Sequence, residues 1–126
     1  MQWYSGKVLH GGKKGKALGY PTINLDPTII PQNLRKGVYA ALVKYDNNLY
    51  RGALFFGPRV ILNETKNVLE IFIFDFDKEI YGQDVEFQIR DFIREVENFS
   101  SMEDLSAQLA KDVKKIRHVT IFDTEQ

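Results

Sequence analysis

The sequence predicts a mainly β protein, namely a small six-stranded antiparallel β-barrel with one principal α-helix near the C-terminus. Two features indicate this fold. Over the first three quarters, short runs rich in β-branched and aromatic residues are separated by glycine, proline and asparagine, which is typical of a small antiparallel barrel. In the last quarter, apolar residues recur at steps of three or four, which is typical of one face of a helix.

Six segments are expected to form the strands. The alternation is clearest at 68–76, where Leu69, Ile71 and Ile73 point to one face and Glu70 points to the other. Turn-forming residues at 46–48 lie between two β-rich runs and predict a tight turn. The six segments are WYSGKVLH (3–10), TINL (22–25), GVYAALVKY (37–45), LYRGALFF (49–56), VLEIFIFDF (68–76) and DVEFQIRDFI (84–93).

The helix is expected at about 101–118, after a barrel that occupies about 1–98. Ser100 followed three residues later by Glu103 has the spacing of a capping box, which marks the start of a helix. The apolar stripe that follows is expected to cover one face of the barrel. Its members are Met102, Leu105, Leu109, Val113 and Ile116. The 126 residues are the length of one domain, so we expect a single domain over 1–126.

Composition limits the classes of function. The 17 basic and 17 acidic residues give a formal net charge of zero, which counts against a general nucleic-acid-binding protein. Cysteine is absent, so disulfides and thiolate metal sites are excluded. The apolar runs are far shorter than the ~20 residues of a membrane-spanning helix, and the first residues lack the features of a signal peptide. We therefore expect a cytoplasmic protein with neither nucleic-acid nor membrane partners.

A cationic, glycine-rich loop precedes the second predicted strand. Glycines let backbone N–H groups approach an anion closely, and lysines add positive charge, so this loop could bind phosphate groups. The loop matches neither the G-x-x-x-x-G-K-[ST] nor the G-x-G-x-x-G pattern, so a solvated hairpin loop is the competing interpretation. The candidate residues are Gly11, Gly12, Lys13, Lys14, Gly15 and Lys16.

Thr22 and Asn24 form a second candidate site just after this loop. Because they lie two positions apart in a predicted strand, they share one face. A hydroxyl and an amide oxygen are hard neutral ligands that suit Mg²⁺, which takes further oxygens from bound phosphates. Two polar residues on the solvent side of a strand are the competing interpretation.

Glu70 and Arg94 are charged residues within or beside apolar strands. Glu70 is the one carboxylate in the run VLEIFIF, and apolar surroundings make a carboxylate a better proton acceptor, as a general base requires. An outer-face position among exposed aromatic residues, or a salt bridge to a lysine, is the competing interpretation. For Arg94, an ion pair with Glu95 or Glu97 competes with a role in binding.

The segment GKVLHGGKKGKALGYPTINL (6–25) resembles the N-terminal signature of the riboflavin kinase family, a glycine-rich loop followed by Leu-Gly-x-Pro-Thr-x-Asn. The resemblance continues in family order through GVYA (37–40), LEIFIFDFDKEIYG (69–82) and IREVENFSSMEDLSAQLAKDV (93–113). It covers nearly the whole chain, and its Pro-Thr-x-Asn element is specific. In bacteria such domains commonly form the C-terminal half of a bifunctional FAD synthetase, so native fusion to an FMN adenylyltransferase domain is an open alternative.

The resemblance implies a Greek-key barrel that transfers a phosphoryl group from ATP to the 5′-hydroxyl of riboflavin, giving FMN. It implies that the loop 11–16 covers the nucleotide phosphates and that Thr22 and Asn24 hold Mg²⁺ or another divalent metal. Glu70 would be the general base on the riboflavin hydroxyl. The residues expected near the flavin are Tyr20, Pro21 and Arg94.

The segment LFFGPRVILNETKNV (54–68) departs from the family pattern. Many bacterial relatives carry Asn-Ile-Gly and then Pro-Thr at this place, whereas here only Gly57-Pro58 persists in form. Because the segment is expected near a substrate, the altered residues 54–61 motivate an alternative, a barrel that binds flavin or nucleotide without turnover. A barrel that binds single-stranded nucleic acid is a further alternative, and the zero net charge counts against it.

Overall fold

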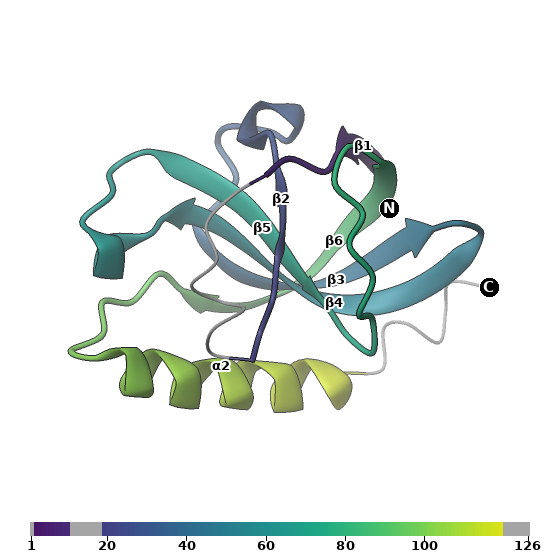
Figure 1. Ribbon diagram of the computed structural model, residues 1–126. Helices are drawn as coiled ribbons and strands as arrows, with labels where there is room; N and C mark the ends of the chain where they lie inside the picture. Colours follow the sequence, from purple (N-terminus) through teal and green to yellow (C-terminus); the bar gives the residue numbers. More distant parts are fainter. Residues whose placement is uncertain (1, 11–18, 120–126) are drawn as a thin grey trace.

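The computed structural model describes residues 2–10 and 19–119. Within these residues, six antiparallel strands form one sheet in the order β1-β6-β3-β4-β5-β2, with a single long helix packed outside it (Figure 1). The strands are β1 (Tyr4–Lys7), β2 (Ile23–Leu25), β3 (Gly37–Tyr45), β4 (Asn48–Pro58), β5 (Asn67–Ile73) and β6 (Asp84–Glu95). The helix is α2 (Met102–Arg117), and two short 3₁₀ helices are η1 (Pro27–Ile29) and η2 (Val60–Leu62). The predicted mainly β fold with a C-terminal helix is confirmed.

The β3–β4 hairpin has the tight turn that the sequence predicts. Tyr45 pairs with Asn48, so Asp46 and Asn47 form a two-residue turn. Both turn residues have positive φ values, 50° and 64°, which aspartate and asparagine tolerate better than most residues. This conformation matches the twist of the two strands, and it therefore fixes the register of the hairpin.

The two outer strands of the sheet approach each other, which curls the sheet into a nearly closed barrel. Just beyond β1, the backbone N–H of Leu9 donates to the carbonyl oxygen of Asn24 in β2 at 2.8 Å. The N–H of Val8 donates to the carbonyl oxygen of Gln83 at 2.9 Å. The first bond joins the two edge strands and occupies backbone groups that an open sheet edge would leave exposed, while the second extends the pairing of β1 with β6 by one residue.

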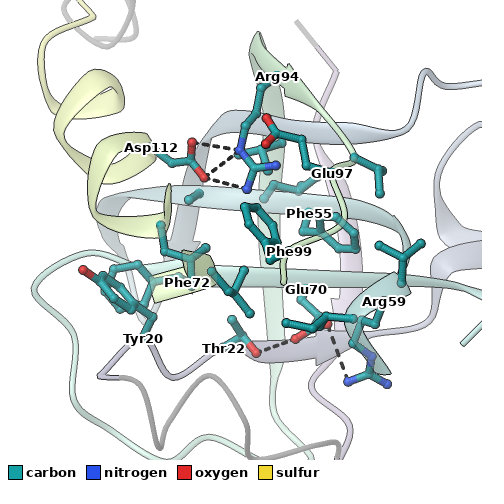
Figure 2. Close-up of a pocket in the computed structure, with 18 of the residues that line it drawn as sticks. Tyr20, Thr22, Phe55, Arg59, Glu70, Phe72, Arg94, Glu97, Phe99 and Asp112 are labelled. Atoms are coloured by element: carbon teal, nitrogen blue, oxygen red, sulfur yellow. Dashed lines mark hydrogen bonds and ion pairs between the residues drawn. The ribbon is translucent and has the colours of Figure 1, made fainter. Parts of the chain in front are cut away.

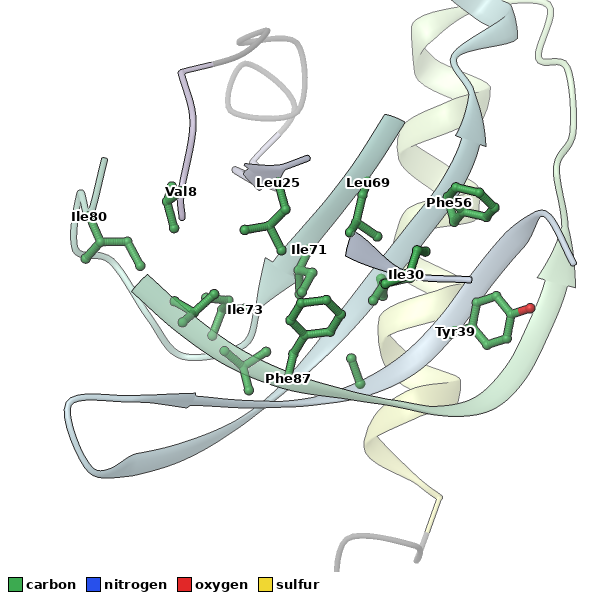
Figure 3. Close-up of a cluster of buried hydrophobic side chains, with 14 residues drawn as sticks. Val8, Leu25, Ile30, Tyr39, Phe56, Leu69, Ile71, Ile73, Ile80 and Phe87 are labelled. Carbon is green, nitrogen blue, oxygen red and sulfur yellow. The ribbon is translucent and has the colours of Figure 1, made fainter. Parts of the chain in front are cut away.

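The interior of the barrel is filled by the inward-facing residues of its strands (Figure 3). In β5, the predicted alternation buries Leu69, Ile71 and Ile73, while Glu70 and Phe72 face outward. The core is completed by residues of the other strands and loops, including Val8, Leu25, Ile30, Leu54, Phe56, Val85 and Phe87. Since the apolar residues of α2 do not enter this core, they are available to cover the outside of the sheet.

Helix α2 packs on the outer face of the sheet, as its apolar stripe predicts. Ile116 is fully buried in a second cluster with Ala40 and Phe74. The side chain of Ser101 accepts a hydrogen bond from the N–H of Asp104 at 3.1 Å and caps the helix. The capping pair is therefore shifted by one residue from the predicted Ser100.

No helix in the described part of the chain is long and apolar enough to cross a bilayer.

A β-bulge near the end of β6 changes the direction of its side chains. Val38 pairs with Arg94 and Tyr39 with Phe92, which leaves Ile93 as an extra residue. Phe92 packs against the barrel core, whereas Ile93 joins the cluster under the helix. As bulges commonly do, this one re-aims a side chain, because Arg94 lines a cavity on the helix side of the sheet.

Asp26 caps the short helix η1 on the other side of the barrel. Its carboxylate accepts hydrogen bonds from the backbone N–H of Thr28 at 2.9 Å and from the Thr28 hydroxyl at 2.8 Å. These bonds hold the pKa of Asp26 below its usual value, and the backbone hydrogen bond from Thr28 has the larger effect. Beside this cap, Ile29 and Ile30 pack against the barrel core, so the segment is tied to the rest of the fold.

Gly37, at the start of β3, lies where the bulged end of β6 approaches closely. Its φ is 153°, and a Cβ atom would lie 2.2 Å from the carbonyl oxygen of Arg94. We expect Gly37→Ala to lower the free energy of unfolding by about 2–4 kcal/mol, through backbone strain and this clash.

Gly82→Ala is the matched control, measured by urea unfolding. Gly82 also has a positive φ, 78°, but no described atom lies within 4 Å of an added Cβ. Its replacement is therefore expected to cost only about 1–2 kcal/mol. Equal losses for the two variants would contradict the close approach of Arg94 to Gly37.

Candidate functional site

A cavity of about 160 Å³ lies between α2 and the outer face of the sheet (Figure 2). Phe55 and Phe72 contribute aromatic rings from β4 and β5, and Phe99 contributes one from the segment that leads to α2. The remaining apolar lining comes mainly from η2 and from the helix, with Val60, Ile61, Leu62, Met102, Leu105, Leu109 and Val113. Charged side chains stand at the two ends of this apolar middle, as Figure 2 shows.

Glu70 stands at one end of the cavity, with a partner on each carboxylate oxygen. The hydroxyl of Thr22 donates to Oε1 at 2.7 Å, and Nη1 of Arg59 lies 3.6 Å from Oε2. The Glu70 side chain is 13% exposed, so it is largely shielded while still open to the cavity. Glu70 thus lies on the outer face of the sheet, as one competing interpretation supposes, but it is largely covered there. Among the described residues its cationic partner is an arginine, and not a lysine as the other supposes.

The pairing of β2 with β5 brings the two predicted metal ligands to Glu70. Asn24 is the direct partner of Glu70 in the register, and directly opposite residues project to the same face. Thr22, two residues away, shares that face. Hydroxyl, amide and carboxylate oxygens together fit the ligand preference of Mg²⁺. Thr22 lines the cavity, whereas Asn24 is half-buried beside it.

No cluster of three histidine, cysteine, aspartate or glutamate side chains with the geometry of a metal site occurs in residues 2–10 and 19–119. A divalent ion held by Thr22 and Asn24 would therefore need further oxygen ligands from a bound nucleotide or from water. Mg²⁺ commonly binds in this way, because it retains several waters and shares substrate phosphates.

A buried ion pair forms the other end of the cavity. Nε of Arg94 donates to both carboxylate oxygens of Asp112 at 3.0 Å, and Nη2 lies 2.9 Å from Oδ2. The two side chains are 12% and 2% exposed. Gln108 donates a further hydrogen bond to Asp112 at 3.0 Å. The competing interpretation, in which Arg94 forms an ion pair with Glu95 or Glu97, is therefore wrong. Arg94 instead pairs with Asp112 and links β6 to the helix.

The other predicted site residues divide into three groups. Tyr20 lines the cavity, and its ring meets that of Phe72 edge to face with 5.4 Å between centroids. Pro21 is exposed and does not line it. The proposed phosphate loop, 11–16, lies outside the described residues. The cavity thus brings Tyr20 together with Thr22, Glu70 and Arg94.

Arg59 and Asp112 are cavity residues that the motifs did not indicate. Arg59 lies in the segment 54–61, which the sequence singles out only for its departure from the family pattern. Asp112 lies three residues after Leu109 and directly before Val113, so it falls on the apolar stripe of the helix. A charged residue on a buried stripe usually has a partner, and this signal could have indicated Asp112.

Comparison with known proteins gives consistent matches over most of the chain. The family model for flavokinase, described as riboflavin kinase, matches residues 2–120. An RNA-binding riboflavin kinase from Bacillus subtilis is 37% identical over 114 residues, which cover 90% of this chain and 49% of the relative. A bifunctional riboflavin kinase/FMN adenylyltransferase from Haemophilus influenzae is 39% identical over 111 residues, which cover 86% and 35%. The chain thus spans half or less of these two relatives.

Two solved structures have a similar fold. A protein from Streptococcus pneumoniae, titled a macrolide-efflux protein, has a TM-score of 0.80 at 32% identity, over 94% of this chain and 39% of that one. The riboflavin kinase from Trypanosoma brucei has a TM-score of 0.64 at 23% identity, over 91% and 76%. The second likeness concerns the fold alone. Because the family model covers almost all of the sequence, the chain belongs to the riboflavin kinase family.

Proposed function

We propose that this chain transfers the γ-phosphoryl group of ATP to the 5′-hydroxyl of riboflavin, giving FMN and ADP. One observation carries the proposal: a carboxylate with a partner on each oxygen stands at the end of a largely apolar cavity. The aromatic rings of Phe55, Phe72 and Phe99 suit a flat ring system. The polar end at Glu70 suits a hydroxyl-bearing chain, and membership of the riboflavin kinase family supports this assignment.

In this proposal Glu70 is the general base. The 5′-oxygen of riboflavin forms a bond to the γ-phosphorus as the bond from that phosphorus to the bridging oxygen of ADP breaks. The hydroxyl proton passes to the carboxylate of Glu70. Phosphoryl transfer of this kind depends mainly on positioning and on neutralising charge. Mg²⁺ held by Thr22 and Asn24 would supply positive charge at the phosphates, together with the lysines of the loop 11–16.

A flavin-sized ligand would need more room than the cavity now offers. Its volume of about 160 Å³ is below the ~300–1,000 Å³ of typical ligand pockets. Val96, Glu97 and Phe99 line it from the irregular segment between β6 and α2. We propose that this segment moves outward to admit the ring. Arg94 would then lie beside the ring, with Tyr20 and Pro21 near the polar end.

A barrel that binds flavin without turnover is a second candidate, because altered residues line the cavity. Phe55 and Ile61 come from the segment 54–61, where the family pattern has polar residues. Incubation of the purified chain with riboflavin, ATP and Mg²⁺, followed by chromatography, decides between the two. FMN that forms only when all three are present supports the kinase. Bound riboflavin without any FMN supports the binding module.

The wider setting of this reaction is also a proposal. Relatives that combine a riboflavin kinase with an FMN adenylyltransferase are consistent with a native fusion of the two activities. We propose a cytoplasmic enzyme whose partners are the small molecules riboflavin and ATP. One relative is named as RNA-binding, but the zero net charge of this chain favours no nucleic-acid partner.

The metal assignment predicts a specific effect of Thr22→Ala and Asn24→Ala. Each variant is expected to lower the apparent affinity for Mg²⁺ in FMN formation at least about tenfold, because each loses an oxygen ligand. Titration of the initial rate with Mg²⁺ at fixed ATP measures this. Thr28→Ala is the matched control, since Thr28 is exposed, its hydroxyl donates to Asp26, and it does not line the cavity. Unchanged Mg²⁺ dependence in both variants would contradict the assignment.

A further inference from the structure

We infer that Arg59 is a positioning residue that orients the carboxylate of Glu70 for proton transfer. The inference rests on the proposed kinase activity, in which Glu70 is the base. Arg59 belongs to the segment 54–61, which departs from the family pattern, and it lines the same cavity as Glu70. Its role would be exerted through Glu70 rather than on the substrate.

Arg59 lies between two carboxylates. Its Nε donates to Oε1 of Glu64 at 2.9 Å, and its Nη1 lies 3.6 Å from Oε2 of Glu70. The guanidinium is planar and rigid, so the bond at Nε restricts the direction in which Nη1 can point. The Arg59 side chain is 26% exposed, which limits the screening of its charge by solvent.

The backbone around η2 places these groups beside each other. Arg59 is the N-cap of η2, and its carbonyl oxygen accepts hydrogen bonds from the N–H groups of Leu62 at 3.0 Å and Glu64 at 3.3 Å. Asn63 ends the turn in the left-handed conformation, with φ of 58°. This compact turn brings Glu64 back to Arg59, so the pair is formed locally, between residues five apart in the sequence.

Glu70 is therefore held at both carboxylate oxygens. Thr22 donates to Oε1 at 2.7 Å, while Arg59 faces Oε2. The terminal torsion of a glutamate is otherwise broad, so the loss of one partner would let the carboxylate rotate. A displacement of about 1 Å in a reacting group can cost up to ~10²-fold in rate. Arg59 is thus expected to raise the rate by fixing the direction of the base.

The first test compares Arg59→Met, which removes the charge but keeps most of the length, with Arg59→Lys, which keeps the charge. Arg59→Met is expected to lower kcat about 10–100-fold. The KM for riboflavin should change less than about threefold, because the lost interaction does not hold the substrate. Arg59→Lys should recover part of kcat. Arg35→Met is the matched control, since Arg35 pairs with Glu95 outside the cavity, and its kcat should be unchanged.

The second test shows whether Arg59 acts through Glu70. In a Glu70→Gln background, Arg59→Met should change kcat less than about twofold, because the group that it positions is already lost. An equal fold loss in both backgrounds would overturn the inference, since Arg59 would then act on its own. A full kcat in Arg59→Met would overturn it as well.

These outcomes are distinct from a failure of the proposed function. If the wild-type chain forms no FMN, the kinase proposal fails, and the catalytic role of Arg59 fails with it. If the wild type forms FMN but the variants do not behave as described, only the role of Arg59 fails. The urea midpoints of the wild type, Arg59→Met, Glu70→Gln and the double variant report the contact itself. The shift of the double variant should be smaller than the sum of the shifts of the two single variants, and additive shifts would overturn the contact.

Discussion

Replacing Glu70 with glutamine is expected to lower the rate of FMN formation about 10²–10⁴-fold, the usual loss when a general base is removed. Glutamine keeps the size of the side chain, and its amide oxygen can still accept the hydroxyl of Thr22. It cannot take up the proton of the riboflavin hydroxyl. Leu69 and Ile71, which anchor this part of β5 in the core, are unchanged, so the variant should fold normally. The kcat of FMN formation measures the effect.

Glu86→Gln provides the comparison for this loss. Glu86 lies exposed on β6, opposite Ser5 and Lys44 in the sheet register and away from the cavity. Its replacement makes the same change of charge and should leave kcat unchanged. A Glu70→Gln protein that matched Glu86→Gln in rate would contradict the assignment of Glu70 as the base.

Replacing Asp112 with alanine is expected to lower the free energy of unfolding by about 3–5 kcal/mol, because it leaves the largely buried Arg94 without its carboxylate partner. Gln108 also loses the acceptor of its hydrogen bond. Replacing both members of the pair with leucine should cost much less, since burial of two apolar groups requires no compensating charge. Urea unfolding of both proteins measures the difference.

Asp75→Ala is the matched control for this ion pair. Asp75 pairs with Arg117, the last residue of α2, and the two side chains are 77% and 38% exposed. Exposed pairs contribute only about 0–1 kcal/mol. A loss for Asp112→Ala no larger than that for Asp75→Ala would show that the Arg94–Asp112 pair does not hold the helix to the sheet.

Much of the fold could be predicted because its local signals agree with one another. The alternation around Leu69, Ile71 and Ile73 indicates which face of β5 enters the core, and the turn residues at 46–48 indicate the hairpin. The apolar stripe of the helix requires a surface to cover, and the outer face of the sheet provides one. The observed N-cap, Ser101, differs by one residue from the predicted Ser100. Both serines are suitable caps, so the local sequence does not distinguish them.

The site was less predictable, because it depends on contacts between residues that are distant in the sequence. The register of β2 against β5, which places Asn24 opposite Glu70, cannot be read from either strand alone. The partner of Arg94 is Asp112, which lies 18 residues away on the helix, and no pattern within β6 indicates it. The contact between Arg59 and Glu70 likewise depends on the path of η2, which has no clear signature in the sequence.

The segment 54–61 was singled out from the sequence, but its role in the site became visible only in the structure. Its departure from the family pattern suggested a loss of function, yet its residues build one wall of the cavity and supply Arg59. Phe55 and Ile61 make that wall more apolar than the family pattern would. The segment therefore forms part of the candidate site despite its departure from the family pattern.

The most direct measurement is the distance between the Glu70 carboxylate and the 5′-hydroxyl of riboflavin, in a crystal structure of the chain with riboflavin, ADP and Mg²⁺. We predict a separation within hydrogen-bond reach, about 2.6–3.2 Å or through one water, with the flavin ring between α2 and the sheet. A flavin bound elsewhere, or bound in this cavity with its 5′-hydroxyl directed away from Glu70, would contradict this account.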